Sequence, residues 1–152
     1  MTFDHDELLR RIILWAKAQA AAGAAVGAPL DEAGLALARK VCVTAPEQVR
    51  VVTVGLLPMP DDPVILDANK VGRLMDPGMA GLTLDHTLFL RQACICPSLL
   101  AHELRHVHQV EEAGSIDAFL TKYLAQFLAV GYDQAPLEVD AREWALRALQ
   151  AP

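Results

Sequence analysis

Residues 97–110 read PSLLAHELRHVHQV, a stretch in which apolar side chains recur every three to four positions around the pentapeptide His102-Glu103-Leu104-Arg105-His106. This spacing predicts an amphipathic helix that begins at Pro97, because proline suits the first turn of a helix. Side chains four positions apart lie on the same side of a helix. We therefore expect the imidazoles of His102 and His106 to point the same way.

An HExxH pattern on a helix is typical of a zinc site, since two such imidazoles can each reach one ion at about 2.0–2.1 Å. Glu103 is rotated by about 100° from His102, which places its carboxylate beside the ion as a general base rather than as a ligand. The alternative is an exposed helix that happens to carry these residues on its polar side. The flanking apolar residues favour a buried helix, in which unpaired histidines would be costly.

The histidine pair needs a third protein ligand, because a catalytic zinc ion has three of them and one open position. His108 is about 200° around the helix from His106 and is expected to face away. The metzincin continuation requires a glycine and a third histidine where this chain has Gln109 and Glu112. That class of metalloprotease is therefore excluded.

Glu138 is the best candidate for the third ligand. Pro136 is expected to begin a helix, and Glu138 then lies in its first turn, at the edge of its apolar stripe. The alternative role for Glu138 is that of an ordinary acid beside a helix N-terminus, which stabilises a helix by at most about 1 kcal/mol. Asp140 is a second, weaker candidate for the ligand.

These residues resemble the core of the small gluzincin-type zinc metallopeptidases, over roughly Leu82–Trp144. The similar segments are the apolar strand before the HExxH helix, that helix, and the stretch from Tyr132 to Ala141. Many gluzincins have an aspartate four residues after the glutamate ligand, where this chain has Arg142. The resemblance implies a zincin-like fold in which His102, His106 and Glu138 bind Zn²⁺ and Glu103 deprotonates the activated water.

The resemblance also implies how a substrate would be held. In such enzymes the strand before the HExxH helix commonly lies along the substrate, so Leu82–Leu90 is expected to pair with an extended peptide. Tyr132 is a candidate donor to the developing oxyanion. The alternative role of Tyr132 is aromatic packing at the turn after Gly131.

The rest of the chain predicts an α+β fold with a small antiparallel sheet and helices packed on one side of it. We expect one domain over 1–152, with N-terminal helices in 1–48, the sheet and loops in 49–91, and the HExxH and C-terminal helices in 97–150. Apolar periodicity predicts helices over 4–22, 31–43 and 116–130, and another after Pro136. Strands are expected over 49–54, 64–66 and 81–91, the last with a kink near 85–86.

The composition of the chain indicates which partners and which cellular compartment to expect. The 152-residue chain has a net charge of −6, which argues against nucleic acid as a partner. The alanine- and glycine-rich stretch 12–30 is too weakly apolar to hold a helix in a membrane. Three cysteines do not suggest a disulfide framework, and Cys94 and Cys96 are expected in the core. We therefore expect a cytoplasmic protein.

These features predict a zinc-dependent hydrolase, a metallopeptidase that cleaves peptide bonds with a zinc-activated water. Its partner would be a peptide or protein substrate. The alternative is a zinc-binding structural or interaction module with a degenerate active site, since the chain is short and Arg142 departs from the gluzincin pattern. An auxiliary domain of a larger assembly is a third hypothesis, based on analogy alone.

Overall fold

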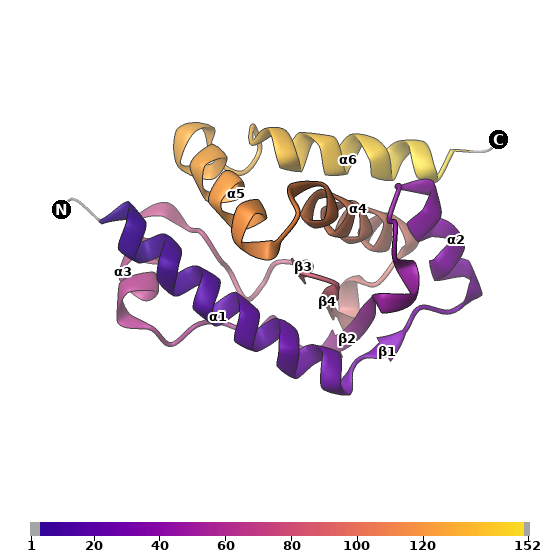
Figure 1. Ribbon diagram of the computed structural model, residues 1–152, viewed down its shortest axis with the longest axis horizontal. Coiled ribbons are helices and arrows are strands. Elements are labelled where there is room, and N and C mark those ends of the chain that lie inside the picture. The colour runs from indigo at the N-terminus through magenta and orange to yellow at the C-terminus, as the bar shows by residue number, and fades with distance from the viewer. Residues whose placement is uncertain (1–3, 151–152) are drawn as a thin grey trace.

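The computed structural model describes residues 4–150, and over this range the chain forms six α-helices and four strands (Figure 1). The helices are α1 (His5–Val26), α2 (Glu32–Lys40), α3 (Pro63–Gly72), α4 (Pro97–Ala113), α5 (Ile116–Val130) and α6 (Pro136–Ala148). The strands are β1 (Ala28–Pro29), β2 (Arg50–Val54), β3 (Gly81–Leu84) and β4 (Thr87–Arg91). Short 3-10 turns lie at Pro46–Gln48 and Gln92–Cys94. The α+β class is as predicted.

The sheet is mixed, so the prediction of an antiparallel sheet is wrong. Its strand order is β1-β2-β4-β3, with β2 and β4 parallel and the other two pairs antiparallel. Parallel pairing needs a long crossover, and here the chain between β2 and β4 supplies α3 and β3. A run of β-branched residues such as 49–54 indicates a strand but not the direction of its neighbour.

The stretch 81–91 is a hairpin rather than one kinked strand. Leu84 pairs with Thr87, and the two residues between them form the turn, in which Asp85 has a φ of +59°. Positive φ is what a two-residue hairpin turn requires, and aspartate accepts it more readily than most residues.

A cluster of polar side chains, here called the His86 cluster (Asp85, His86 and Glu111), ties this turn to α4. His86 Nδ1 lies 2.8 Å from Asp85 Oδ1, and His86 Nε2 lies 3.1 Å from Glu111 Oε2. Glu111 also accepts hydrogen bonds from the backbone N–H groups of Thr44 and Ala45. The hydrogen bond to Asp85, followed by that to Glu111, outweighs burial and raises the pKa of His86.

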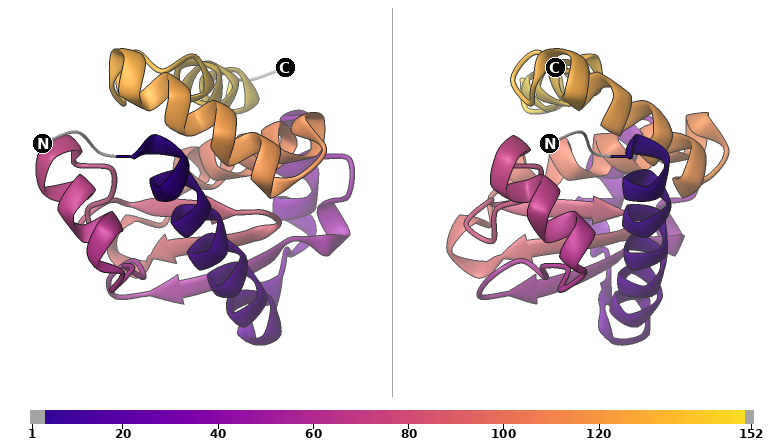
Figure 2. Two further views of the ribbon diagram at one scale, coloured as in Figure 1. Left: turned by 60° about the vertical axis from the view of Figure 1, so that its left-hand side comes forward. Right: turned by 90° about the vertical axis from the view of Figure 1, so that its left-hand side faces the viewer.

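Helices cover both faces of the sheet, which corrects the expectation that they lie on one side. Thr87 faces α1, because its hydroxyl donates to the carbonyl oxygen of Ala20 at 2.9 Å, and α1 crosses the strands in Figure 2. Leu88 and Leu90 point the other way and belong to a core cluster that includes Leu104 of α4. Both faces of β4 are therefore apolar and buried, as in a strand at the centre of a sheet.

The alanine- and glycine-rich stretch 12–30 forms most of α1 and continues through β1, and its small residues let the helix approach the sheet closely. A Cβ added at Gly23 would lie 2.6 Å from Thr87 Cγ2 and 2.8 Å from Phe89 Cζ. Ala20 and Ala16 are buried one and two turns earlier, respectively. Over residues 4–150, no helix combines the length and apolar character needed to cross a membrane.

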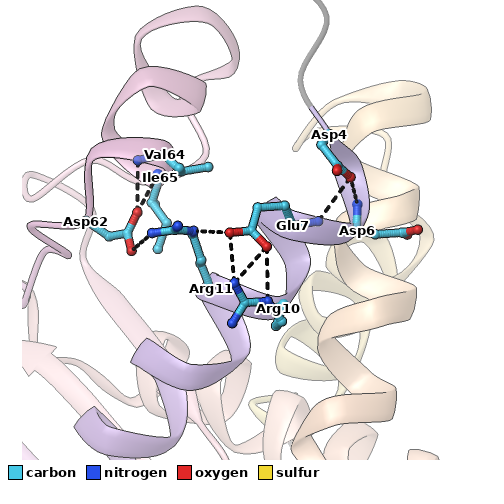
Figure 3. Close-up of polar contacts among 8 residues, drawn as sticks. All are labelled: Asp4, Asp6, Glu7, Arg10, Arg11, Asp62, Val64 and Ile65. Atoms are coloured by element: carbon cyan, nitrogen blue, oxygen red, sulfur yellow. Dashed lines mark hydrogen bonds and ion pairs between the residues drawn. The ribbon is translucent and has the colours of Figure 1, made fainter.

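Residues 64–66, expected to be a strand, lie in α3. Asp62 caps this helix by accepting from the backbone N–H groups of Val64 and Ile65, and Pro63 occupies its first turn. Asp62 also accepts from Arg11 at 2.8 Å, and Arg11 in turn donates to Glu7, so an ion-pair chain joins α3 to α1 (Figure 3). The Asp-Pro pair was the signal for a helix start that the β-branched residues obscured.

Candidate metal centre

Helix α4 carries the histidine pair, and it begins at Pro97 as the sequence predicts. Pro97 occupies the first turn, and Gly114 ends the helix with a φ of +92°, a conformation that favours glycine. The apolar side is buried against the sheet and α6, and it includes Ala101, Leu104 and Val107. The HExxH residues thus lie on a buried helix, and His106 is itself only 6% exposed.

Helix α6 brings in Glu138 from the other side. Pro136 lies in the first turn, and Gln126 of α5 accepts a hydrogen bond from the backbone N–H of Leu137 at 2.9 Å. Glu138 is only 2% exposed. An acid that merely stabilises a helix N-terminus does not need such burial, and glutamate is rarely buried unless it is paired. In Figure 1, α6 lies alongside α4 at the top of the molecule.

The three predicted ligand residues converge. Glu138 Oε1 lies 3.1 Å from His102 Nε2, Glu138 Oε2 lies 2.9 Å from His106 Nε2, and the two Nε2 atoms are 3.2 Å apart. Donors bonded to one tetrahedral zinc ion at about 2.0–2.1 Å lie about 3.3 Å from one another, so this donor set fits the ion. Within residues 4–150, His102, His106 and Glu138 form the one group of three ligand-type side chains that could hold a metal.

In this buried group, one carboxylate is paired with two imidazoles. Burial opposes the charged form of Glu138, but its hydrogen bonds to His102 and His106 outweigh burial and hold the pKa of Glu138 well below its usual range. Burial likewise favours neutral His106, but the hydrogen bond to Glu138 and the negative charges of Glu138 and Glu103 raise the pKa of His106 to about 9. In this group Glu138 is therefore ionised, and its negative charge stabilises a positive charge on His106.

Gln109, which the sequence reasoning used only to exclude metzincins, orients one of the ligands. Its Nε2 donates to the carbonyl oxygen of Leu137 and to Asp140 Oδ2, both at 2.8 Å, so its Oε1 faces His106. His106 Nδ1 lies 2.8 Å from that Oε1 and must be the donor. This places a proton on His106 Nδ1, so Nε2 is the ring atom that faces Glu138 and that would bind a metal in place of a second proton.

Asp140, the weaker candidate, lies outside the ligand group. Its carboxylate accepts from Arg105 Nε at 2.8 Å and from Gln109, and Arg105 also donates to the carbonyl oxygen of Val41. The Arg105 guanidinium stacks 4.1 Å from the ring centre of Trp144. Asp140 of α6 therefore stabilises the packing of α6, which carries Glu138, against α4, which carries the two histidines.

Glu103 lies beside the ligands without belonging to them. It is 5% exposed, and Thr83 of β3 donates a hydrogen bond to Glu103 Oε2 at 2.6 Å. A Cβ added at Gly81 would lie 2.9 Å from Glu103 Oε1. Strand β3 therefore holds the Glu103 carboxylate from one side, through the Thr83 hydroxyl and the close approach of Gly81, where an added Cβ would displace the carboxylate.

Two tyrosines face Glu138, of which the sequence singled out one. Tyr132 is 38% exposed and lines the same cavity as Glu103, His106 and Glu138. Tyr123 was missed, because it lies within the apolar pattern of α5, and its hydroxyl donates to Glu138 Oε2 at 3.3 Å. Burial, followed by the charge of Glu138, raises the pKa of both tyrosines, so both keep a proton to donate.

The remaining sequence candidates lie away from the ligand group. His108 faces away as expected, with Nδ1 2.8 Å from the carbonyl oxygen of Cys42. The expectation that Cys94 and Cys96 are buried in the core is wrong, since Cys94 is half-buried and Cys96 is exposed. Cys42 is exposed as well. Arg142 donates to the carbonyl oxygen of Asp133, so it anchors the turn that carries Tyr132.

The predicted docking strand is only half available. Strand β3 is the outer strand of the sheet, and its far edge adjoins the site. Strand β4, the second half of Leu82–Leu90, is paired to β2 on one side and β3 on the other. An extended peptide has no free backbone to pair with over Thr87–Arg91, so that part of the prediction is wrong.

Comparisons of this chain with protein-family models, with curated proteins and with solved structures found no match.

Proposed function

We propose that the protein is a zinc-dependent hydrolase, a metallopeptidase whose metal is held by His102, His106 and Glu138. The observation that carries this proposal is the convergence of the three side chains within 3.2 Å of one another, with the Glu103 carboxylate next to them and outside the group. Three protein ligands from two helices leave one coordination position for water or substrate, which is the pattern of catalytic zinc sites.

Zn²⁺ bound here supplies a Lewis acid that acidifies water and polarises a carbonyl. The Glu103 carboxylate accepts the proton from the attacking water and returns it to the leaving amine. Thr83 keeps that carboxylate oriented through its hydrogen bond. Tyr132, which stays protonated, donates to the oxygen on which negative charge develops. The free edge of β3 pairs with the backbone of an extended peptide.

The test combines a metal assay with a peptide-cleavage assay on Glu103→Gln. Glu112→Gln is the matched control, since Glu112 lies on the same helix and its side chain is 72% exposed. We expect Glu103→Gln to retain zinc and to lose about 10²–10⁴-fold in kcat, the range of a general base. The control should match the wild type in both assays.

Two results would contradict parts of this proposal. Cleavage by Glu103→Gln at the wild-type rate would remove Glu103 as the base. Stoichiometric zinc with no cleavage of any peptide in a proteome-derived library would favour a zinc-binding structural or interaction module instead.

A further inference from the structure

An apolar cavity of about 120 Å³ opens directly beside the metal-ligand group. His106, Glu103, Glu138 and Tyr132 form its polar end. Most of the rest of its wall consists of apolar side chains from α1, α3, the segment after α3, β3 and α5. The largest of these are Ile12, Trp15, Ile65, Leu74, Leu120 and Leu124.

The apolar wall of this cavity disfavours the binding of charged groups. Apart from residues of the polar end, Asp76 is the one charged residue among those that line the cavity, and Asp76 is itself exposed to solvent. A cavity of about 150 Å³ lined by leucine, isoleucine and phenylalanine stays dry and binds benzene. The cavity here is of similar size and lining, so its natural occupant is an uncharged group as large as a leucine or phenylalanine side chain.

The position of β3 connects the cavity to an extended chain. Gly81 and Thr83 face Glu103, whereas Leu82 and Leu84 alternate with them and line the cavity. All four residues of β3 border the cavity, so a peptide paired to the free edge of β3 runs past its opening. One side chain of such a peptide, close to the bond facing Glu103, then points into the cavity.

We propose that this cavity is a specificity pocket that takes one bulky apolar side chain, leucine- or phenylalanine-sized, next to the cleaved bond of the substrate. This inference rests on the proposed function. The pocket is preformed, because the ion pair between Arg11 and Asp62 joins α1 to α3 (Figure 3), and Trp15 of α1 packs against the core cluster that contains Ile65 of α3. A preformed apolar pocket binds without the entropic cost of ordering its walls.

The first experiment measures binding without catalysis. Zinc-loaded Glu103→Gln is titrated with N-acetyl-leucinamide, N-acetyl-phenylalaninamide and N-acetyl-glycinamide by ligand-observed NMR. Burial of a leucine side chain predicts about tenfold or greater preference for leucinamide over glycinamide. Leu120→Trp fills the cavity and should abolish this preference, whereas Leu128→Trp, which changes a 45% exposed residue on the same helix, should keep it.

The second experiment measures cleavage of a peptide library varied around the cleaved bond. For the wild type we expect kcat/KM to be about ten- to a hundredfold higher with leucine or phenylalanine than with glycine at one flanking position. Leu120→Trp should remove this advantage. Stoichiometric zinc and a wild-type circular dichroism spectrum would show that the variant folds.

The outcomes separate the two proposals. Cleavage with no preference at either flanking position, or an unchanged preference in Leu120→Trp, overturns the specificity pocket and leaves the hydrolase in place. Binding that is equal for leucinamide and glycinamide also overturns the pocket. Leucine-selective binding that Leu120→Trp abolishes, with no peptide cleaved, supports the pocket and contradicts the hydrolase.

Discussion

Replacing Gln109 by methionine tests whether the residue that orients His106 matters for metal binding. Methionine is similar to glutamine in length but offers neither the amide oxygen nor the amide N–H groups. The change therefore removes the 2.8 Å acceptor of His106 Nδ1 and the donor to Leu137 and Asp140. The substitution leaves His102, His106 and Glu138 unchanged, so any change in zinc affinity must come from a change in the orientation of these side chains.

The magnitude follows from two separate losses. Without its acceptor, the His106 ring is free to take the other tautomer and other orientations, and loss of such a partner typically costs about 10–100-fold in metal affinity, or about 1.4–2.7 kcal/mol. The buried carbonyl of Leu137 also loses a donor, which costs about 1–3 kcal/mol of folding stability. Metal affinity and stability are therefore measured independently, by competition with a chromophoric chelator and by urea unfolding.

Gln126→Met is the matched control. Gln126 bonds only to the backbone N–H of Leu137 among these groups, so its loss weakens the start of α6 without touching an imidazole. We expect this control to lose about 1 kcal/mol of stability and to keep zinc affinity within about threefold. The reasoning is refuted if folded Gln109→Met binds zinc as tightly as the control does.

Two further predictions concern the fold. Gly23→Ala should lower the free energy of unfolding by about 1–2 kcal/mol, because the added Cβ meets Thr87 at 2.6 Å and this overpacking outweighs the better helix propensity of alanine; Gly72→Ala, with open space around it, should be neutral or stabilising in the same urea titrations. His86→Asn should lower the free energy of unfolding most below pH 6.5, because the raised pKa of His86 means that its protonated form stabilises the fold there. The difference from the wild type should shrink as the pH rises through that pKa. Equal differences at about pH 5.5 and about pH 9 would contradict this prediction.

The candidate site was predictable to the extent that it depends on local geometry. The spacing of His102 and His106 fixes their common side on any helix, and Pro136 places Glu138 in a first turn. Their convergence was expected and is found. Gln109 was not predicted, because its role depends on the relative placement of α4 and α6, and no local pattern encodes that placement.

The arrangement of the sheet was the part that sequence patterns failed to specify. Leu82, Leu84, Leu88 and Leu90 continue one alternation through the turn, so the stretch resembled a single strand. Only the positive φ of Asp85, a conformation open to several residue types, divides it. Parallel pairing of β2 with β4 depends on contacts between residues about 37 positions apart, as between Val51 and Leu88, and alternation within each strand carries no information about such a partner.

The separation of the ligand helices from the cavity walls has a consequence for how such a protein changes over time. All three metal-ligand candidates lie after residue 100, whereas Ile12, Trp15 and Ile65 come from the first half of the chain. In the proposed hydrolase, exchanging those three residues would reshape what enters the cavity while Glu103 and the ligand residues keep their surroundings. A library randomised at these positions, far upstream of the HExxH helix, would then be the direct way to obtain new selectivities.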